Sequence, residues 1–148
     1  MLLCVQTYRP IMVSPGTPPS LTFVSQSPPF SGSGPADASL LIDEMLEGPA
    51  MVILDNATVA IFDLGEVASF SKIQVYANVP GILGSTGDAI FEGSETSDFA
   101  VTIPLGTATM PPGSTWTDID DSTPSAPVRY IRLTAVGTWG ASEIRVLS

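Results

Sequence analysis

The sequence predicts an all-β protein, an eight-stranded jelly-roll β-sandwich with an extended proline-rich N-terminal arm. Three observations support this prediction. Glycine (13) and proline (14) are abundant and charged residues make up only 14% of the 148 residues, a composition typical of short strands joined by many turns. Short apolar segments recur between turn residues. Several of these segments also alternate between polar and apolar side chains, as strands with one buried face do.

The N-terminal arm is predicted to span residues 1–35. Its prolines favour extended backbone over helix, and they flank one short apolar run, residues 21–24. Two alternatives stay open: the segment lies on its own domain as an edge strand, or it lies as an arm on a neighbouring subunit. The second predicts that deleting residues 1–20 abolishes assembly but leaves the sandwich, residues 36–148, folded.

Eight segments are predicted to be strands: residues 50–55, 58–64, 71–78, 88–92, 100–103, 115–119, 128–135 and 141–147. Alternation is clearest in the third, where Ile73 and Val75 are expected to face the core while Lys72 and Gln74 face solvent. In residues 128–135, Ile131 and Leu133 are expected inside and Arg132 outside. The one helix candidate, residues 37–46, is expected to form no more than a short turn, because Pro49 follows it.

Charge narrows the choice of partners. The chain contains fifteen acidic residues, five basic residues and no histidine, and its net charge is -10. A field of this sign repels phosphate backbones and anionic headgroups, so we expect neither nucleic acid nor a membrane as partner. No apolar run approaches the roughly 20 residues that cross a bilayer. Cations, neutral sugars and basic protein surfaces remain.

No enzyme is predicted, and no catalytic residue. Histidine is missing as a neutral-pH base, and the one thiol, Cys4, lies in the arm. Paired carboxylates at residues 92–95 and 118–121 are interpreted as solvated turn residues. A single cysteine also excludes an internal disulfide, which suits a reducing compartment, and no signal peptide is recognised at the N-terminus.

Three pieces of sequence carry a resemblance to a known family. They are residues 38–43 (ASLLID), residues 60–65 (AIFDLG) with 73–75, and residues 128–134 (VRYIRLT) with 141–146 (ASEIRV). Together they resemble the discoidin or coagulation-factor C-type family of galactose-binding-like domains, over residues 36–148. The resemblance implies an eight-stranded jelly roll, in agreement with the strand count. The sequence departs from the family pattern at Glu44, where glycine is usual, and lacks its terminal cysteine pair.

The resemblance implies a structural calcium site. Many family members hold Ca²⁺ between the first loop and the last strand, and Asp43 and Glu143 match those positions. Carboxylates and backbone carbonyls are suitable ligands for Ca²⁺. The alternative is that Asp43 caps a turn and Glu143 pairs with an arginine such as Arg145 or Arg132.

The resemblance also implies a carbohydrate site on loops at one end of the sandwich. Trp139 lies in the sequence GTWG (residues 137–140), where the two glycines are expected to leave its ring free to contact a sugar. Trp116 is a second candidate. The alternative is that both tryptophans pack against the core.

Two functional hypotheses follow. In the first, the protein is a structural subunit of a virus particle, such as a bacteriophage capsid decoration, tail or fibre component, assembled in the host cytoplasm and bound to other subunits or to copies of itself. In the second, it is a soluble lectin-like carbohydrate-binding module. We favour the first hypothesis, because the apolar residues of the arm are best covered by neighbouring subunits and because the predicted sugar site is poor in hydrogen-bond donors.

Overall fold

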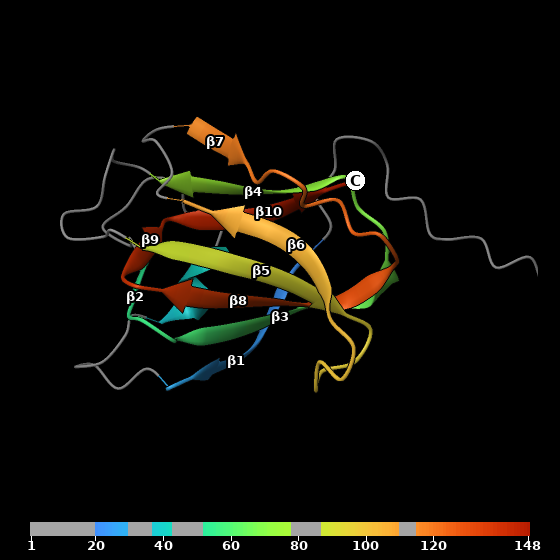
Figure 1. Cartoon of the computed structure of the whole chain (residues 1–148), viewed down its shortest axis with the longest axis horizontal. Helices are drawn as coiled ribbons and strands as arrows, with labels where there is room; N and C mark the ends of the chain where they lie inside the picture. The colour runs from blue at the N-terminus through green and yellow to red at the C-terminus, as the bar shows by residue number, and fades with distance from the viewer. Residues whose placement is uncertain (1–19, 30–36, 43–51, 78–86, 110–114) are drawn as a thin grey trace, which may run out of the picture.

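The computed structural model of the chain describes residues 20–29, 37–42, 52–77, 87–109 and 115–148, which form a β-sandwich (Figure 1). The larger sheet has five strands in the order β1-β3-β8-β5-β6, and the smaller has three in the order β10-β4-β7. A further pair joins β2 to β9. All of these pairings are antiparallel. The prediction of an all-β sandwich is therefore confirmed.

The elements are bounded as follows: β1 (Thr22–Ser27), the 3-10 helix η1 (Ala38–Ile42), β2 (Val52–Leu54), β3 (Val59–Ala68), β4 (Lys72–Ala77), β5 (Asp88–Ser94), β6 (Ile103–Ala108), β7 (Thr115–Asp118), β8 (Val128–Val136), β9 (Trp139–Ala141) and β10 (Glu143–Leu147). The helix candidate is thus a single 3-10 element. The carboxylate of Asp37 accepts the Ser39 backbone N–H at its start (3.0 Å), as capping residues do.

Two predicted strands differ from the observed ones. The segment predicted at 100–103 is mostly loop, and β6 begins only at Ile103, because the chain leaves β5 through a turn in which Phe99 has a left-handed φ of 53°. The segment predicted at 141–147 is divided between β9 and β10. The division falls at Ser142, whose N–H is donated to the Tyr76 carbonyl (2.7 Å), so that the chain passes from β2 to β4 as its pairing partner.

The strand β1 lies inside the segment that was predicted to be an arm. It pairs with β3 at the edge of the larger sheet, and the Phe23 ring contacts Phe62 edge-to-face at 6.1 Å. Gln26 accepts the backbone N–H of Ala38 (2.7 Å) and thereby ties β1 to η1. For residues 20–29, the structure agrees with the alternative of an edge strand on the chain's own domain. Residues 1–19 and 30–35 of the predicted arm lie outside the described residues.

The core lies between the two sheets and continues under η1. It is built from inward-facing side chains of all the larger elements, and the largest fully buried ones are Trp139, Phe62, Phe91, Leu41, Leu54, Ile73, Leu105, Ile131 and Leu133. Burial of one such side chain stabilises the fold by about 1.5–3 kcal/mol. Ile73, Val75, Ile131 and Leu133 face this core, as their alternation predicted. No helix in the described part of the chain is long and apolar enough to cross a membrane.

Candidate functional site

The outer face of the smaller sheet gathers polar and aromatic side chains. Along β4 the inward residues Ile73, Val75 and Ala77 are buried, so Lys72, Gln74 and Tyr76 lie on the opposite face. Strand pairing then sets their neighbours. Gln74 lies between Arg145 of β10 and Asp118 of β7, and Tyr76 lies between Glu143 and Trp116.

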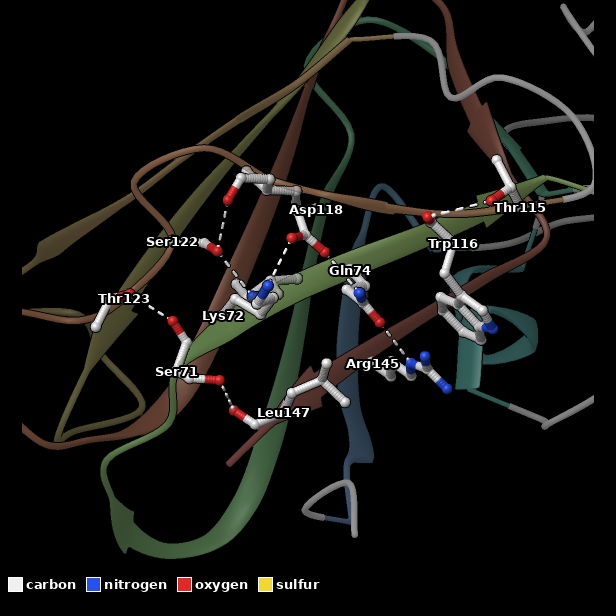
Figure 2. A network of polar contacts seen from close by, with 12 residues as sticks. Ser71, Lys72, Gln74, Thr115, Trp116, Asp118, Ser122, Thr123, Arg145 and Leu147 are labelled. Carbon is white, nitrogen blue, oxygen red and sulfur yellow. Dashed lines mark hydrogen bonds and ion pairs between the residues drawn. The ribbon is translucent and has the colours of Figure 1, made fainter. Parts of the chain in front are cut away.

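Hydrogen bonds connect four of these side chains across all three strands (Figure 2). Arg145 donates from Nε to Gln74 Oε1 at 2.8 Å, and Gln74 donates from Nε2 to Asp118 Oδ1 at 2.6 Å. Lys72 Nζ reaches the other carboxylate oxygen of Asp118 at 2.6 Å. We call Lys72, Asp118, Gln74 and Arg145, in the order in which they are bonded, the polar row. Because each member is bonded to the next, the row holds a defined arrangement of donors and acceptors at the surface.

Two aromatic rings lie at one end of the polar row. Tyr76 and Trp116 are half-buried, and their ring centroids are 5.4 Å apart at an interplanar angle of 50°. The guanidinium carbon of Arg145 lies 3.9 Å from the centroid of Trp116, a cation–π arrangement. We call Tyr76, Trp116 and Arg145 the aromatic end. It combines an apolar ring surface with several N–H donors.

The carboxylate of Asp118 is held in its charged form. Hydrogen bonds from Gln74, and then from Lys72, lower its pKa below the usual value for an aspartate, although partial desolvation opposes them. At neutral pH this group is therefore a strong hydrogen-bond acceptor that stands between two donors.

The loop after β7 is anchored beneath this face. Ser122 Oγ accepts the N–H of Ile73 (2.8 Å) and donates to the carbonyl of Ile119 (2.7 Å), and Thr123 donates to the Ser71 carbonyl. Figure 2 shows Ser71, Ser122 and Thr123 at the same end of β4 as Lys72. They fix the end of β7 against β4 and so hold Asp118 beside its partners.

Comparison with known proteins gives a match at the level of fold alone. No protein-family model matches the sequence, and no curated protein matches it. A family 32 carbohydrate-binding module of Clostridium perfringens NanJ, solved with galactose, aligns with a TM-score of 0.63 at 17% identity over 87% of this chain and 94% of that chain. A second module of Clostridium perfringens, solved with GalNAc-β-1,3-galactose, aligns with a TM-score of 0.59 at 15% identity over 86% and 94% of the two chains.

The chain has the galactose-binding-like fold. The resemblance stated from the sequence pieces is confirmed at this level. Allantoicase from Saccharomyces cerevisiae also contains the fold, with a TM-score of 0.63 at 16% identity, and the match covers 90% of this chain but 44% of that enzyme. The galactose-binding-like fold therefore occurs in binding modules and in at least one enzyme, and function must be argued from the side chains.

Trp139, the first predicted sugar-binding residue, is fully buried within the galactose-binding-like fold. It pairs with Leu54 across β9 and β2, contacts the Phe91 ring edge-to-face at 6.4 Å, and donates its indole N–H to the Thr109 carbonyl at 3.3 Å. For Trp139 the alternative of packing against the core is therefore confirmed, and the expectation that its ring is free is wrong. Flanking glycines indicate only the local backbone conformation. The burial of Trp139 depends on the pairing of β9 with β2, a long-range contact that neighbouring residues do not predict.

Trp116, the second predicted residue, lies at the aromatic end on the outer face. Its partners Tyr76 and Arg145 were not predicted as site residues. The alternation of residues 72–76 could have indicated them, because it places Lys72, Gln74 and Tyr76 on one exposed face.

The predicted calcium ligands are described only in part. Asp43 lies outside the described residues. Glu143 is buried at the start of β10, with 5% of its surface exposed. Arg132, one of the arginines considered as its partner, pairs with Glu92 (2.7 Å), and Glu143 has a partner of its own. Among the described residues no three His, Cys, Asp or Glu side chains form a group able to hold a metal ion. Calcium binding by Asp43 and Glu143 stays a prediction.

The acidic pairs interpreted as turn residues are partly strand residues. Glu92 lies in β5 and accepts both Nε and Nη2 of Arg132 (3.0 and 2.7 Å), and Asp118 is the last residue of β7. Each is bonded to a cation from a neighbouring strand. The residues adjacent to Glu92 and Asp118 did not indicate these ion pairs, because Arg132 and Lys72 lie 40 and 46 positions away in the sequence.

Proposed function

We propose that this protein is a non-catalytic carbohydrate-binding module, and that its ligand contacts the aromatic end of the smaller sheet. One observation carries the proposal: the half-buried rings of Trp116 and Tyr76 lie together on the outer face, with the guanidinium of Arg145 over the Trp116 ring. A sugar ring has an apolar C–H face that packs on aromatic rings and hydroxyl groups that need hydrogen-bond partners. The aromatic end supplies both.

The fold supports the same class of ligand. Two structures with this fold were solved with galactose or GalNAc-β-1,3-galactose. Of the two sequence-based hypotheses, this likeness favours the lectin-like module over the virion subunit, which none of the compared structures supports. The argument against sugar binding was that the predicted site on the loops has few hydrogen-bond donors. The outer face of the smaller sheet, in contrast, carries the donors Lys72, Gln74 and Arg145.

Three of the described carboxylates are bonded to cations, which supports a binding role rather than catalysis. Asp63 accepts two bonds from Arg129 (2.9 and 3.0 Å), Glu92 is bonded to Arg132 and Asp118 to Lys72. Hydrogen bonds from Arg129 and from Gln74 lower the pKa of Asp63 and of Asp118, respectively, so these two carboxylates are weak bases at neutral pH.

The test is binding of the full chain to a glycan array, followed by calorimetry with the best glycan. Trp116→Ala should weaken binding at least about tenfold, since stacked aromatics are typical binding hot spots. Tyr130→Ala is a matched control, because Tyr130 is a half-buried aromatic with the Arg129 guanidinium 5.2 Å above its ring, on the other sheet. It should leave affinity unchanged. Equal effects of the two variants, or the absence of any bound glycan, would contradict the proposal.

A further inference from the structure

We infer that the ligand is a neutral oligosaccharide lying along β4, and that the polar row contacts a sugar unit beyond the one held at the aromatic end. This inference rests on the proposed function and names its ligand class. It depends on the length of the outer face, on the unused hydrogen-bonding capacity of the polar row, and on its balance of charge.

The face is longer than one sugar ring. An antiparallel strand rises about 3.4 Å per residue, so the outward side chains of Tyr76 and Lys72 are about 14 Å apart along β4. Figure 2 shows Trp116 toward one end of β4 and Lys72 toward the other, with Gln74 between them. A single sugar stacked on Trp116 cannot also reach Lys72, whereas an extended chain of sugars can contact both.

The polar row retains hydrogen-bonding capacity. An aspartate can accept about four hydrogen bonds and a lysine can donate about three. Asp118 and Lys72 contact one another, and their side chains remain 48% and 39% exposed. Arg145 donates to Gln74 through Nε, and its two terminal nitrogens have no acceptor among the residues that the structure describes. Hydroxyl groups both donate and accept, so they can bond to the carboxylate and to the two cations without breaking the row.

The charges of the face cancel. Lys72 and Asp118 form an ion pair on it, and strand register places Arg145 and the buried carboxylate of Glu143 on the same face. The whole chain has a net charge of -10, which repels an anionic glycan at long range. On a face whose charges cancel, a cationic glycan gains no net attraction and a neutral chain meets no net repulsion.

The experiment measures affinity against ligand length. The probes are β-linked galactose oligomers of one to four units, the matching glucose oligomers, and a trimer of galacturonic acid. We expect the trimer of the preferred neutral sugar to bind at least about tenfold more tightly than the monomer, which corresponds to contacts with an additional sugar unit. The galacturonic acid trimer should bind more weakly than its neutral counterpart, and a tenfold rise in NaCl should change the neutral affinity little.

Variants of the polar row test where the additional sugar lies. Asp118→Asn and Lys72→Gln should weaken trimer binding more than monomer binding. Glu92→Gln alters the ion pair with Arg132 on the other sheet and is the matched control, which should change neither affinity. Thermal unfolding of each variant checks that it is folded.

The outcomes separate this inference from the proposed function. Suppose that the monomer binds, that Trp116→Ala abolishes this binding, and that longer oligomers bind no more tightly. The proposed function then holds, but the inference of an extended ligand along β4 is wrong. Equal losses for monomer and trimer in Asp118→Asn, or tighter binding of the anionic trimer, also overturn it. If no glycan binds, both proposals fall.

Discussion

Gly65 and Gly106 share a left-handed backbone but have different surroundings. Their φ angles are +85° and +87°. A Cβ on Gly65 would meet nothing within 4 Å, whereas one on Gly106 would lie 2.2 Å from the carbonyl oxygen of Asp120 and 3.0 Å from Ile119. Gly65→Ala should therefore lower the free energy of unfolding by about 1 kcal/mol, from backbone strain alone.

Gly106→Ala should lower the free energy of unfolding clearly more than Gly65→Ala does, because the backbone after β7 has to move as well. Urea denaturation of both variants measures the difference. Equal losses would mean that the contact with Asp120 relaxes without penalty.

Asp63 makes stability depend on pH. A side-chain hydrogen bond from Arg129 lowers the pKa of its carboxyl group, and a bond from the Gly65 N–H adds to the effect against the desolvation of burial. A group with a lowered pKa stabilises the fold above its unfolded pKa, about 3.9, and loses that contribution as the pH falls through the folded value.

The stability advantage of the wild type over Asp63→Asn should therefore be full at about pH 6 and shrink steadily below about pH 4. Urea denaturation across this range tests it. In an Arg129→Gln background the same comparison should depend much less on pH, and an unchanged dependence there would assign the effect to another group.

At the scale of elements, strand faces were predictable where alternation is local. The residues from Lys72 to Tyr76 and from Arg129 to Leu133 alternate clearly, and the structure places their apolar members in the core. The burial of Trp139 and the association of Asp118 with Lys72 depend on which strands pair. Pairing over such separations leaves no trace in a short window of sequence, so the candidate site was found only through Trp116.

For a related reason, the sequence left the strand β1 as one of two alternatives for the N-terminal segment. It lies between proline-rich segments and contains Ser25, Gln26 and Ser27, so its composition resembles a linker. Its position depends on Phe23, which packs against the core cluster, and on pairing with β3.

Phe23 and Val24 test whether β1 is an integral strand. They are adjacent, but Phe23 packs on Phe62 whereas Val24 is 45% exposed. Phe23→Ala should lower the free energy of unfolding by about 2 kcal/mol, less than a fully buried phenylalanine would. Val24→Ala should change it by less than about 0.5 kcal/mol. Similar small effects of both would show that β1 adds little to the domain.

At the scale of the whole molecule, nearly all order comes from distant pairings. Val59 pairs with Thr134 and Lys72 with Leu147, while the described helical structure amounts to η1 alone. Such topologies close long loops before they gain contacts, so we expect folding in milliseconds to seconds. The Trp116→Phe variant leaves Trp139 as the sole tryptophan, a core reporter for stopped-flow fluorescence. Folding within microseconds would contradict this expectation.

The position of the C-terminus has a practical consequence for measuring binding. Ser71, immediately before β4, donates its hydroxyl to the carbonyls of Leu147 (3.0 Å) and Ser148 (3.2 Å). The C-terminus therefore lies beside Lys72, while Trp116 lies toward the far end of β4. A sensor chip or bead coupled at the C-terminus would crowd the Lys72 end. Immobilised in this way, the protein would under-report its preference for long glycans, whereas measurements in free solution would retain it.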